Sequence, residues 1–103
     1  MVTENANGEI LLERFDLDGP EMAEAQTIVD KYAERIKNLT DYTQIKLEMK
    51  VHPKGKNRHF EIKGHVMYKN GKAVSEETDM NPFVAIDKVM NKMFGEIQHQ
   101  IRK

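Results

Sequence analysis

The sequence predicts an α+β fold: a two-layer β-α-β-β-β-α sandwich with a four-stranded sheet and both helices on one face of that sheet. Three observations support this prediction. Two segments carry apolar residues at steps of three and four, the period of an amphipathic helix. Several shorter segments alternate apolar and polar residues, the period of a half-buried strand. The chain has 103 residues, which is enough for one modest hydrophobic core and too few for two.

The amino-terminal residues, 1–8, are predicted to form a flexible acidic tail, because with Asn5 and Gly8 they offer little that a core would bury. They carry neither a cationic leader nor an apolar run, so export or membrane insertion is not expected. Residues 9–103 are predicted to form a single domain. Its first strand is expected over residues 9–14, a short run with an apolar centre.

The first helix is predicted to begin at Asp18-Gly19-Pro20, where Asp or Gly can cap the helix and Pro suits its first position. It should run to about Asn38. Its apolar residues recur at helical spacing and gather on one face, which is expected to cover the sheet. These residues are Ala25, Ile28, Val29, Tyr32, Ile36 and Leu39.

Three strands are predicted after this helix. Residues 44–51 alternate cleanly between apolar and polar side chains, and residues 52–57 interrupt them as a polar loop. The alternation resumes over residues 60–66. Asn70-Gly71 then predicts a type I′ hairpin turn, in which both central residues take positive φ, with a return strand over residues 72–76.

The second helix is predicted to begin after Asn81, with Pro82 in its first turn, and to reach almost to the carboxyl terminus. It has the most regular helical period in the sequence, so its apolar face is expected to pack on the apolar face of the sheet. The facing residues are Phe83, Ile86, Met90, Met93 and Ile97 on the helix, and Ile45, Leu47, Phe60 and Ile62 on the sheet.

The charge balance restricts any nucleic-acid surface to a local one. The 16 lysines and arginines are offset by 17 aspartates and glutamates, for a net charge of −1, whereas nucleic-acid-binding proteins usually carry a basic excess. The acidic residues crowd the first third of the chain, which leaves the rest net basic. The absence of cysteine excludes disulfides and thiolate chemistry, and it suits a cytoplasmic protein.

No pattern in the sequence predicts an enzyme. Ser75 is the only serine, and neither a glycine-rich phosphate loop nor a G-x-S-x-G motif occurs. The four histidines lack the i, i+4 spacing of a helical zinc site, so we expect no metal and no cofactor. His59 and His65 are expected on the solvent face of their strand. The regularly spaced methionines are expected to fill the core.

Basic residues give the only functional signal. On the second helix a set of them falls within a sector of about 60° at 100° per residue. Lys31 and Arg35 lie one turn apart on the first helix, and the predicted loop adds three more. If the helices pack side by side, these sets would border one cationic groove for RNA phosphates, although lysines on any solvated helix face look the same. The candidate RNA-binding residues are Lys31, Arg35, Lys54, Lys56, Arg58, Lys88, Lys92, His99, Arg102 and Lys103.

The last helix also carries a family resemblance. Asp79-Met80 is followed by Ala85-Ile86-Asp87-Lys88 and then by Lys92, while Lys31-Tyr32-Ala33 leads into residues 44–50. With the order of elements, this pattern resembles the ribosome hibernation factors, the ribosome-associated inhibitor family of the small-subunit interface. In that family the Asp-Met pair is followed by an aromatic residue and Ala-Ile-Asp. Phe83 holds the aromatic place here, displaced by the extra Asn81-Pro82, and the similarity covers residues 9–103.

The resemblance implies a protein that occupies the mRNA and tRNA channel of the small ribosomal subunit and keeps the ribosome in an inactive state. Basic residues on its helices and loops would contact ribosomal RNA. Lys31, Arg35, Lys88 and Lys92 sit where the family has basic residues, while the final Arg102-Lys103 matches its basic tail in type. No small-molecule substrate and no membrane partner are implied.

Two other functions remain open from the sequence. A protein-interaction or small-ligand module on the same fold would use the basic residues only for solvation. A double-stranded-RNA-binding domain shares the helix, three strands, helix order, but it usually opens its last helix with a lysine cluster, which residues 81–84 lack.

Overall fold

The computed structural model describes residues 2–5 and 8–102. Its elements follow the predicted order, with one strand added at the start of the chain. They are β1 (Val2–Asn5), β2 (Gly8–Glu13), α1 (Gly19–Lys37), β3 (Tyr42–Lys54), β4 (Asn57–Tyr68), β5 (Gly71–Asp79) and α2 (Pro82–Ile101).

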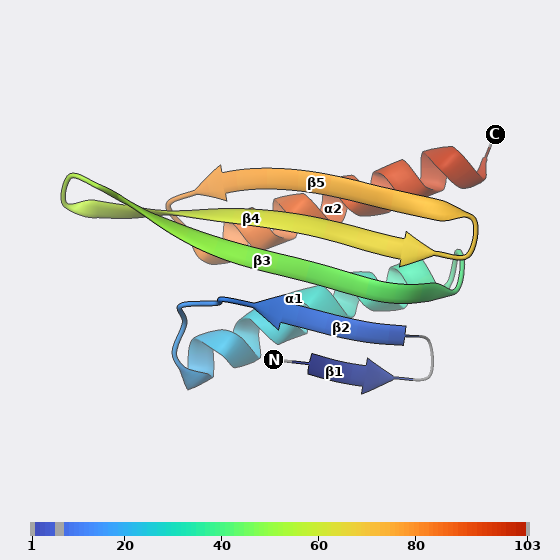
Figure 1. Ribbon diagram of the computed structural model, residues 1–103, viewed down its shortest axis with the longest axis horizontal. Helices are drawn as coiled ribbons and strands as arrows, with labels where there is room; N and C mark the ends of the chain where they lie inside the picture. Colours follow the sequence, from blue (N-terminus) through green and yellow to red (C-terminus); the bar gives the residue numbers. More distant parts are fainter. Residues whose placement is uncertain (1, 6–7, 103) are drawn as a thin grey trace.

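The five strands form one mixed sheet in the order β1-β2-β3-β4-β5. β2 and β3 pair in parallel across the α1 crossover, and the other neighbours are antiparallel. Both helices lie side by side on one face of the sheet, which leaves the other face open (Figure 1). The α+β fold, the four predicted strands and the placement of both helices are therefore confirmed.

Both helices begin where the sequence places caps. The Asp18 side chain accepts a hydrogen bond from the Glu21 backbone N–H at 2.8 Å, and the Glu21 carboxylate accepts one from the Asp18 N–H at 3.1 Å. This reciprocal capping box satisfies two donors that would otherwise lack helical partners. At α2 the Asn81 side chain accepts from the Phe83 N–H at 2.9 Å, and Pro82 follows it as the first helical residue.

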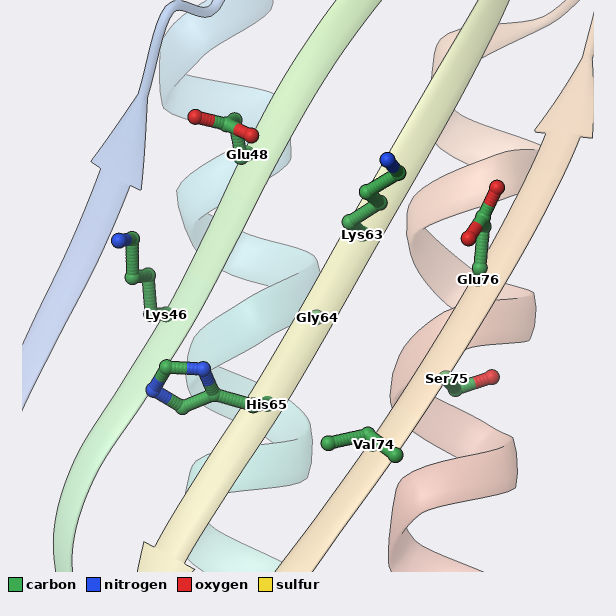
Figure 2. A pocket seen from close by; sticks show the side chains of 8 residues that line it. All are labelled: Lys46, Glu48, Lys63, Gly64, His65, Val74, Ser75 and Glu76. Atoms are coloured by element: carbon green, nitrogen blue, oxygen red, sulfur yellow. The ribbon is translucent and has the colours of Figure 1, made fainter.

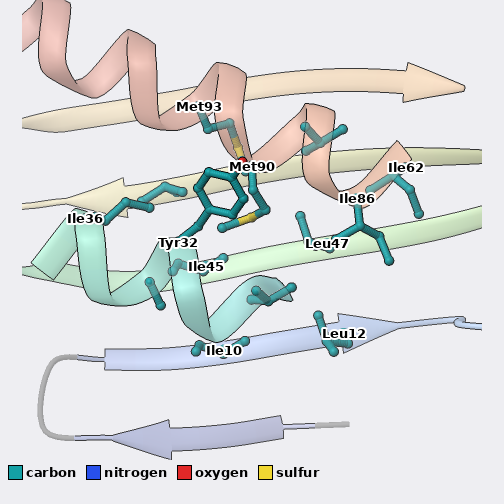
Figure 3. Close-up of a cluster of buried hydrophobic side chains, with 14 of the residues drawn as sticks. Ile10, Leu12, Tyr32, Ile36, Ile45, Leu47, Ile62, Ile86, Met90 and Met93 are labelled. Carbon is teal, nitrogen blue, oxygen red and sulfur yellow. The ribbon is translucent and has the colours of Figure 1, made fainter. Parts of the chain in front are cut away.

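One hydrophobic core fills the space between the helices and the sheet (Figure 3). The predicted facing residues of α2 and the sheet are buried, except that Phe83 packs at the margin of the core. The core methionines Met49, Met90 and Met93 are almost completely buried, which confirms them as core residues. Neither α1 nor α2 has an apolar stretch long enough to cross a membrane.

Gly64 lets α2 approach the sheet closely. It is buried on the helix side of β4, where a Cβ atom would lie 2.7 Å from Leu47 Cδ2 and 2.7 Å from Val89 Cγ1. Since side-chain carbons in contact usually stay about 3.5–4.0 Å apart, only glycine fits this position without displacing its neighbours. The contact of α2 with β4 therefore depends on a residue without a side chain.

Strand β1 differs from the loose tail predicted for residues 1–8. Residues 2–5 pair antiparallel with β2, with Val2 opposite Leu11 and Asn5 opposite Gly8. Without this pairing, the backbone N–H and C=O groups of β2 would lack partners on this edge. Residues 2–5 therefore form a strand through backbone hydrogen bonds, although they have few apolar side chains to bury.

The predicted polar loop at residues 52–57 is mostly strand. β3 continues to Lys54 and β4 begins at Asn57, so the turn is Gly55-Lys56 alone. Gly55 has φ 62° and Lys56 does not have positive φ, the pattern of a type II′ turn. Pro53 is tolerated because β2 pairs with β3 only as far as Glu48, and beyond it β3 is an edge strand.

The type I′ turn predicted at Asn70-Gly71 is wrong. Gly71 already pairs with Tyr68, so the two loop residues are Lys69 and Asn70. Neither of these residues, nor Gly71, has positive φ. The Lys69 N–H donates to the Asp41 carbonyl at 3.2 Å, which ties the turn to the residue before β3.

Candidate nucleic-acid interface

Two candidate residues on α1 face α2. Lys31 Nζ lies 3.7 Å from the Asp87 carboxylate of α2, and the Tyr32 hydroxyl donates to the same carboxylate at 3.0 Å. Lys31 and Arg35 also lie over the Tyr32 ring, at 5.0 and 5.2 Å from its centroid. Burial raises the pKa of the Tyr32 phenol, and the hydrogen bond to Asp87 raises it further. We call Lys31 and Arg35 the α1 group.

The two candidate lysines of α2, the α2 group, lie on its other flank, beside β5. Lys88 Nζ is 3.6 Å from the Asp79 carboxylate, and Lys92 Nζ is 2.6 Å from that of Glu77. The side chains of Lys88 and Lys92 are 51% and 60% exposed, so both ammonium groups reach solvent. The partner carboxylates of Asp79 and Glu77 are only 29% and 22% exposed, so a phosphate would reach these ammonium groups from their solvent side while the carboxylates stay in place.

The α1 and α2 groups therefore do not border one groove, and that expectation is wrong. Asp87 points to α1, and Lys88 is the next residue along the helix. Successive residues of an α-helix are rotated by about 100°, so Lys88 cannot face α1 as well. Both groups still lie on the helix layer, separated by the width of α2.

The third set of candidates lies on the β3–β4 hairpin, and we call Lys54, Lys56 and Arg58 the hairpin group. The hairpin projects past the start of both helices at one end of the molecule (Figure 1). Arg58 pairs with Asp16 at 3.1 Å and stacks over Phe60. Within the described residues Lys54 and Lys56 have no carboxylate within ion-pair distance, and residues 50–60 include no acid.

The remaining candidates lie at the opposite end of the molecule. His99 is exposed in the last turn of α2, and Arg102 is the exposed residue that caps the helix. Lys103 lies outside the described residues. The molecule measures 45 × 26 × 16 Å, so the hairpin group and Arg102 are separated along its longest dimension.

The open face of the sheet carries charges of both signs around a hollow of about 470 Å³ (Figure 2). Lys46 pairs with Glu13 at 3.3 Å, and His65 shares a hydrogen bond of 2.9 Å with the Gln44 side chain. Partial burial lowers the pKa of His65, and the positive charges of Lys46 and Lys72 lower it further. His65 and His59 are both partly exposed on this face, as predicted. Its mixed charges make this face less suited to a polyanion than the hairpin.

A pair of hydrogen-bonded carboxyl groups on this face was not predicted. A hydrogen bond with Glu76 lowers the pKa of Glu61, and a hydrogen bond with His52 lowers it further. The same Glu61–Glu76 hydrogen bond raises the pKa of Glu76. His52 Nε2 lies 2.9 Å from the Glu61 carboxylate. The sequence shows these residues only as polar positions of different strands, and it is the register of β3, β4 and β5 that brings them together. Among the described residues, no three histidines or carboxylates are grouped to hold a metal ion.

Comparison with known proteins gives no match to a family model or to a curated protein sequence. Twelve chains of solved structures match the fold, and two examples follow. The crystal structure of the Thermus thermophilus Protein Y N-terminal domain aligns with a TM-score of 0.62 at 17% identity, over 91% of this chain and 98% of the other. A ribosomal subunit interface protein from Coxiella burnetii aligns with a TM-score of 0.66 at 12% identity, with the same coverages. The chain has the fold of these two proteins.

On this fold, the candidate basic residues are spread along the length of the molecule and do not form a compact pocket. The hairpin group stands at one end, the α1 and α2 groups flank α2 along the helix layer, and His99 and Arg102 stand at the other end. Acidic side chains accompany the α1 and α2 groups, whereas Lys54 and Lys56 are unopposed within the described residues. This arrangement suits contact with a long polyanion along the molecule.

Proposed function

We propose that the chain is a ribosome-binding translation regulator of the hibernation type, which occupies the mRNA and tRNA channel of the small subunit. It acts by occupancy and has no catalytic activity. The observation that carries the proposal is the fold shared with a ribosomal subunit interface protein over 91% of this chain. The last-helix pattern from Asp79-Met80 to Lys88 supports it independently, because that pattern consists of residue identities, whereas the shared fold is a likeness of backbone geometry.

The contacts with ribosomal RNA are made to phosphates by the three basic groups. Lysine ammonium groups on a helix flank follow a charged backbone and read no base sequence, so binding depends little on RNA sequence. Lys88 and Lys92 contact phosphate from their solvent side, because both ammonium groups reach solvent while they remain paired with Asp79 and Glu77. The net charge of −1 then matters less than the local charge of the hairpin and the helix layer.

The test is comigration with small ribosomal subunits in a sucrose gradient. Because phosphate contacts release counterions, wild-type protein should comigrate at low salt and leave the particle at high salt. The variant Lys88→Gln/Lys92→Gln should weaken comigration and reduce the slope of log affinity against log salt by about one per lost phosphate contact. Glutamine is preferred to glutamate here, because glutamate would repel Asp79 and Glu77.

A second variant and a matched control locate the surface. Lys54→Gln/Lys56→Gln removes the two unopposed cations of the hairpin and should weaken comigration at least as much as the α2 variant. Lys46→Gln/Lys50→Gln removes two positive charges from the open sheet face and should have a much smaller effect. If only the sheet-face variant lost binding, the interface would lie on the open sheet face and the proposed surface would be wrong. If wild type never comigrated, the protein-interaction module would be the better account.

A further inference from the structure

The outer edge of β5 is a long free strand edge. β5 is the last strand of the sheet and pairs only with β4. At the other end of the sheet β1 has four residues, whereas β5 has nine. An edge of this kind presents backbone N–H and C=O groups that can pair with another strand. β5 is therefore the place where the sheet can be extended.

β5 lacks two of the features that usually protect an edge strand. It contains no proline, and its pairing with β4 runs without a bulge from Asp79 to Gly71. Val74 stands on the open face of this strand with 56% of its surface exposed, among the most exposed of the large apolar residues described. Such edges are normally blunted by charge, bulges or proline. Of the four charged residues of β5, Lys72 and Glu76 share the open face and are of opposite sign, while Glu77 and Asp79 pair with Lys92 and Lys88 of α2.

We propose that a second copy of this chain docks on this edge, β5 against β5 and antiparallel, with the two-fold axis at Val74. A two-fold axis at one residue pairs positions that lie equally far before and after it. Centring on Val74 places Lys72 opposite the partner's Glu76, and the same ion pair forms again on the other side of the axis. The two Val74 side chains then cover each other.

Charge complementarity selects this register from the alternatives. A register centred on Ser75 would place Val74 opposite the partner's Glu76, and one centred on Glu76 would oppose two like charges. Directly opposed like charges destabilise a strand pair, and opposite charges stabilise it.

The neighbouring side chains are compatible with this pairing. Glu76 already has Lys63 of β4 opposite it in a single copy, and the partner's Lys72 would approach the same carboxyl group from the free edge. Lys92 lies on the β5 flank of α2, already paired with Glu77. The cation that α2 places beside the proposed β5–β5 contact is therefore already neutralised by a carboxylate of its own chain. A nine-residue edge is smaller than a standard interface, so the dimer should be weak and concentration-dependent.

The test is sedimentation of the full chain over a series of protein concentrations. Wild type should show a monomer–dimer equilibrium. Lys72→Glu and Glu76→Lys should each weaken self-association at least about tenfold, or about 1.4 kcal/mol, because two attractive pairs become repulsive. An equimolar mixture of the two variants should associate again, because in the mixed dimer every glutamate at these positions faces a lysine.

The control is Lys37→Glu, the same change of charge in the last turn of α1, which should leave the dimerisation constant unchanged. The proposal is overturned if wild type stays monomeric at every concentration, or if the mixed variants associate no better than each variant alone. Restoration in the mixture also guards against misfolding, since two unfolded variants would not recover a folded dimer. Self-association is measured in the absence of ribosomes, so its failure would leave the proposed function standing.

Discussion

Adding one methyl group should destabilise this protein at Gly64 and stabilise it at Gly95. At Gly64 the new Cβ would lie 2.7 Å from Leu47 Cδ2, 2.7 Å from Val89 Cγ1 and 2.8 Å from Met93 Cε. These three side chains are completely buried, so none can move into solvent to make room. The methyl group must therefore push α2 away from the sheet or force its neighbours off their rotamers.

The magnitude follows from two opposing effects. Overpacking a core typically costs about 1–3 kcal/mol. Replacing glycine also reduces the freedom of the unfolded chain, which stabilises the fold by about 0.4–1 kcal/mol. We expect Gly64→Ala to lose a net of about 1–2 kcal/mol. Gly95 is exposed in the interior of α2 with nothing within 4 Å of the new Cβ, so Gly95→Ala should gain up to about 1 kcal/mol.

Urea unfolding followed by circular dichroism measures both changes on the same scale. The midpoints should move in opposite directions while the slope of free energy against urea stays constant. If Gly64→Ala were as stable as wild type, α2 would not pack on β4 as closely as described. If both variants gained stability, the whole effect would come from the unfolded chain.

Three further predictions test the core, a helix cap and the carboxyl pair. Ile86→Ala should cost about 2–5 kcal/mol in urea unfolding, because it empties a completely buried site. Asp18→Ala should cost about 1 kcal/mol, measured in the same way, because it removes half of the capping box with Glu21. Glu76 has a raised pKa, so its protonated form adds stability that is lost as the pH rises through that folded pKa. Carboxyl NMR should show Glu76 titrating above Glu61, and equal pKa values would contradict the hydrogen-bonded pair.

The sequence predicted the parts of the fold that depend on local periodicity. Both helix starts follow from a capping residue and proline within three positions, as at Asp18 and Asn81. The buried faces of α2 and β3 follow from regular spacing, and Ile86 and Leu47 are buried as expected. These features are readable because one side of each element faces the core along its full length.

The errors lie where long-range pairing overrides local preference. Residues 52–57 look like a loop, but strand pairing carries β3 and β4 up to a two-residue turn, with proline accepted on an edge. Asn70-Gly71 looks like a type I′ turn, yet Gly71 belongs to β5 and the contact of Lys69 with Asp41 fixes a different turn. No local pattern specifies which residue of a strand finds which partner.

The candidate interface shows the same limit. The spacing of Lys88 and Lys92 correctly placed them on one side of α2, but it did not say which neighbour stands on that side. The structure places β5 there, with Asp79 and Glu77, and places α1 on the side of Asp87. The cluster of Glu61 with Glu76 was equally hidden, because it depends on the register of separate strands.

Displacement of a labelled mRNA from small ribosomal subunits tests the central claim most directly. A fluorescent mRNA fragment is bound to purified small subunits, the protein is titrated in, and the anisotropy of the fragment is followed. Occupancy of the channel predicts that the protein releases the mRNA, and that Lys54→Gln/Lys56→Gln and Lys88→Gln/Lys92→Gln require higher concentrations to do so. A stable complex that holds both the protein and the mRNA at saturation would contradict the account.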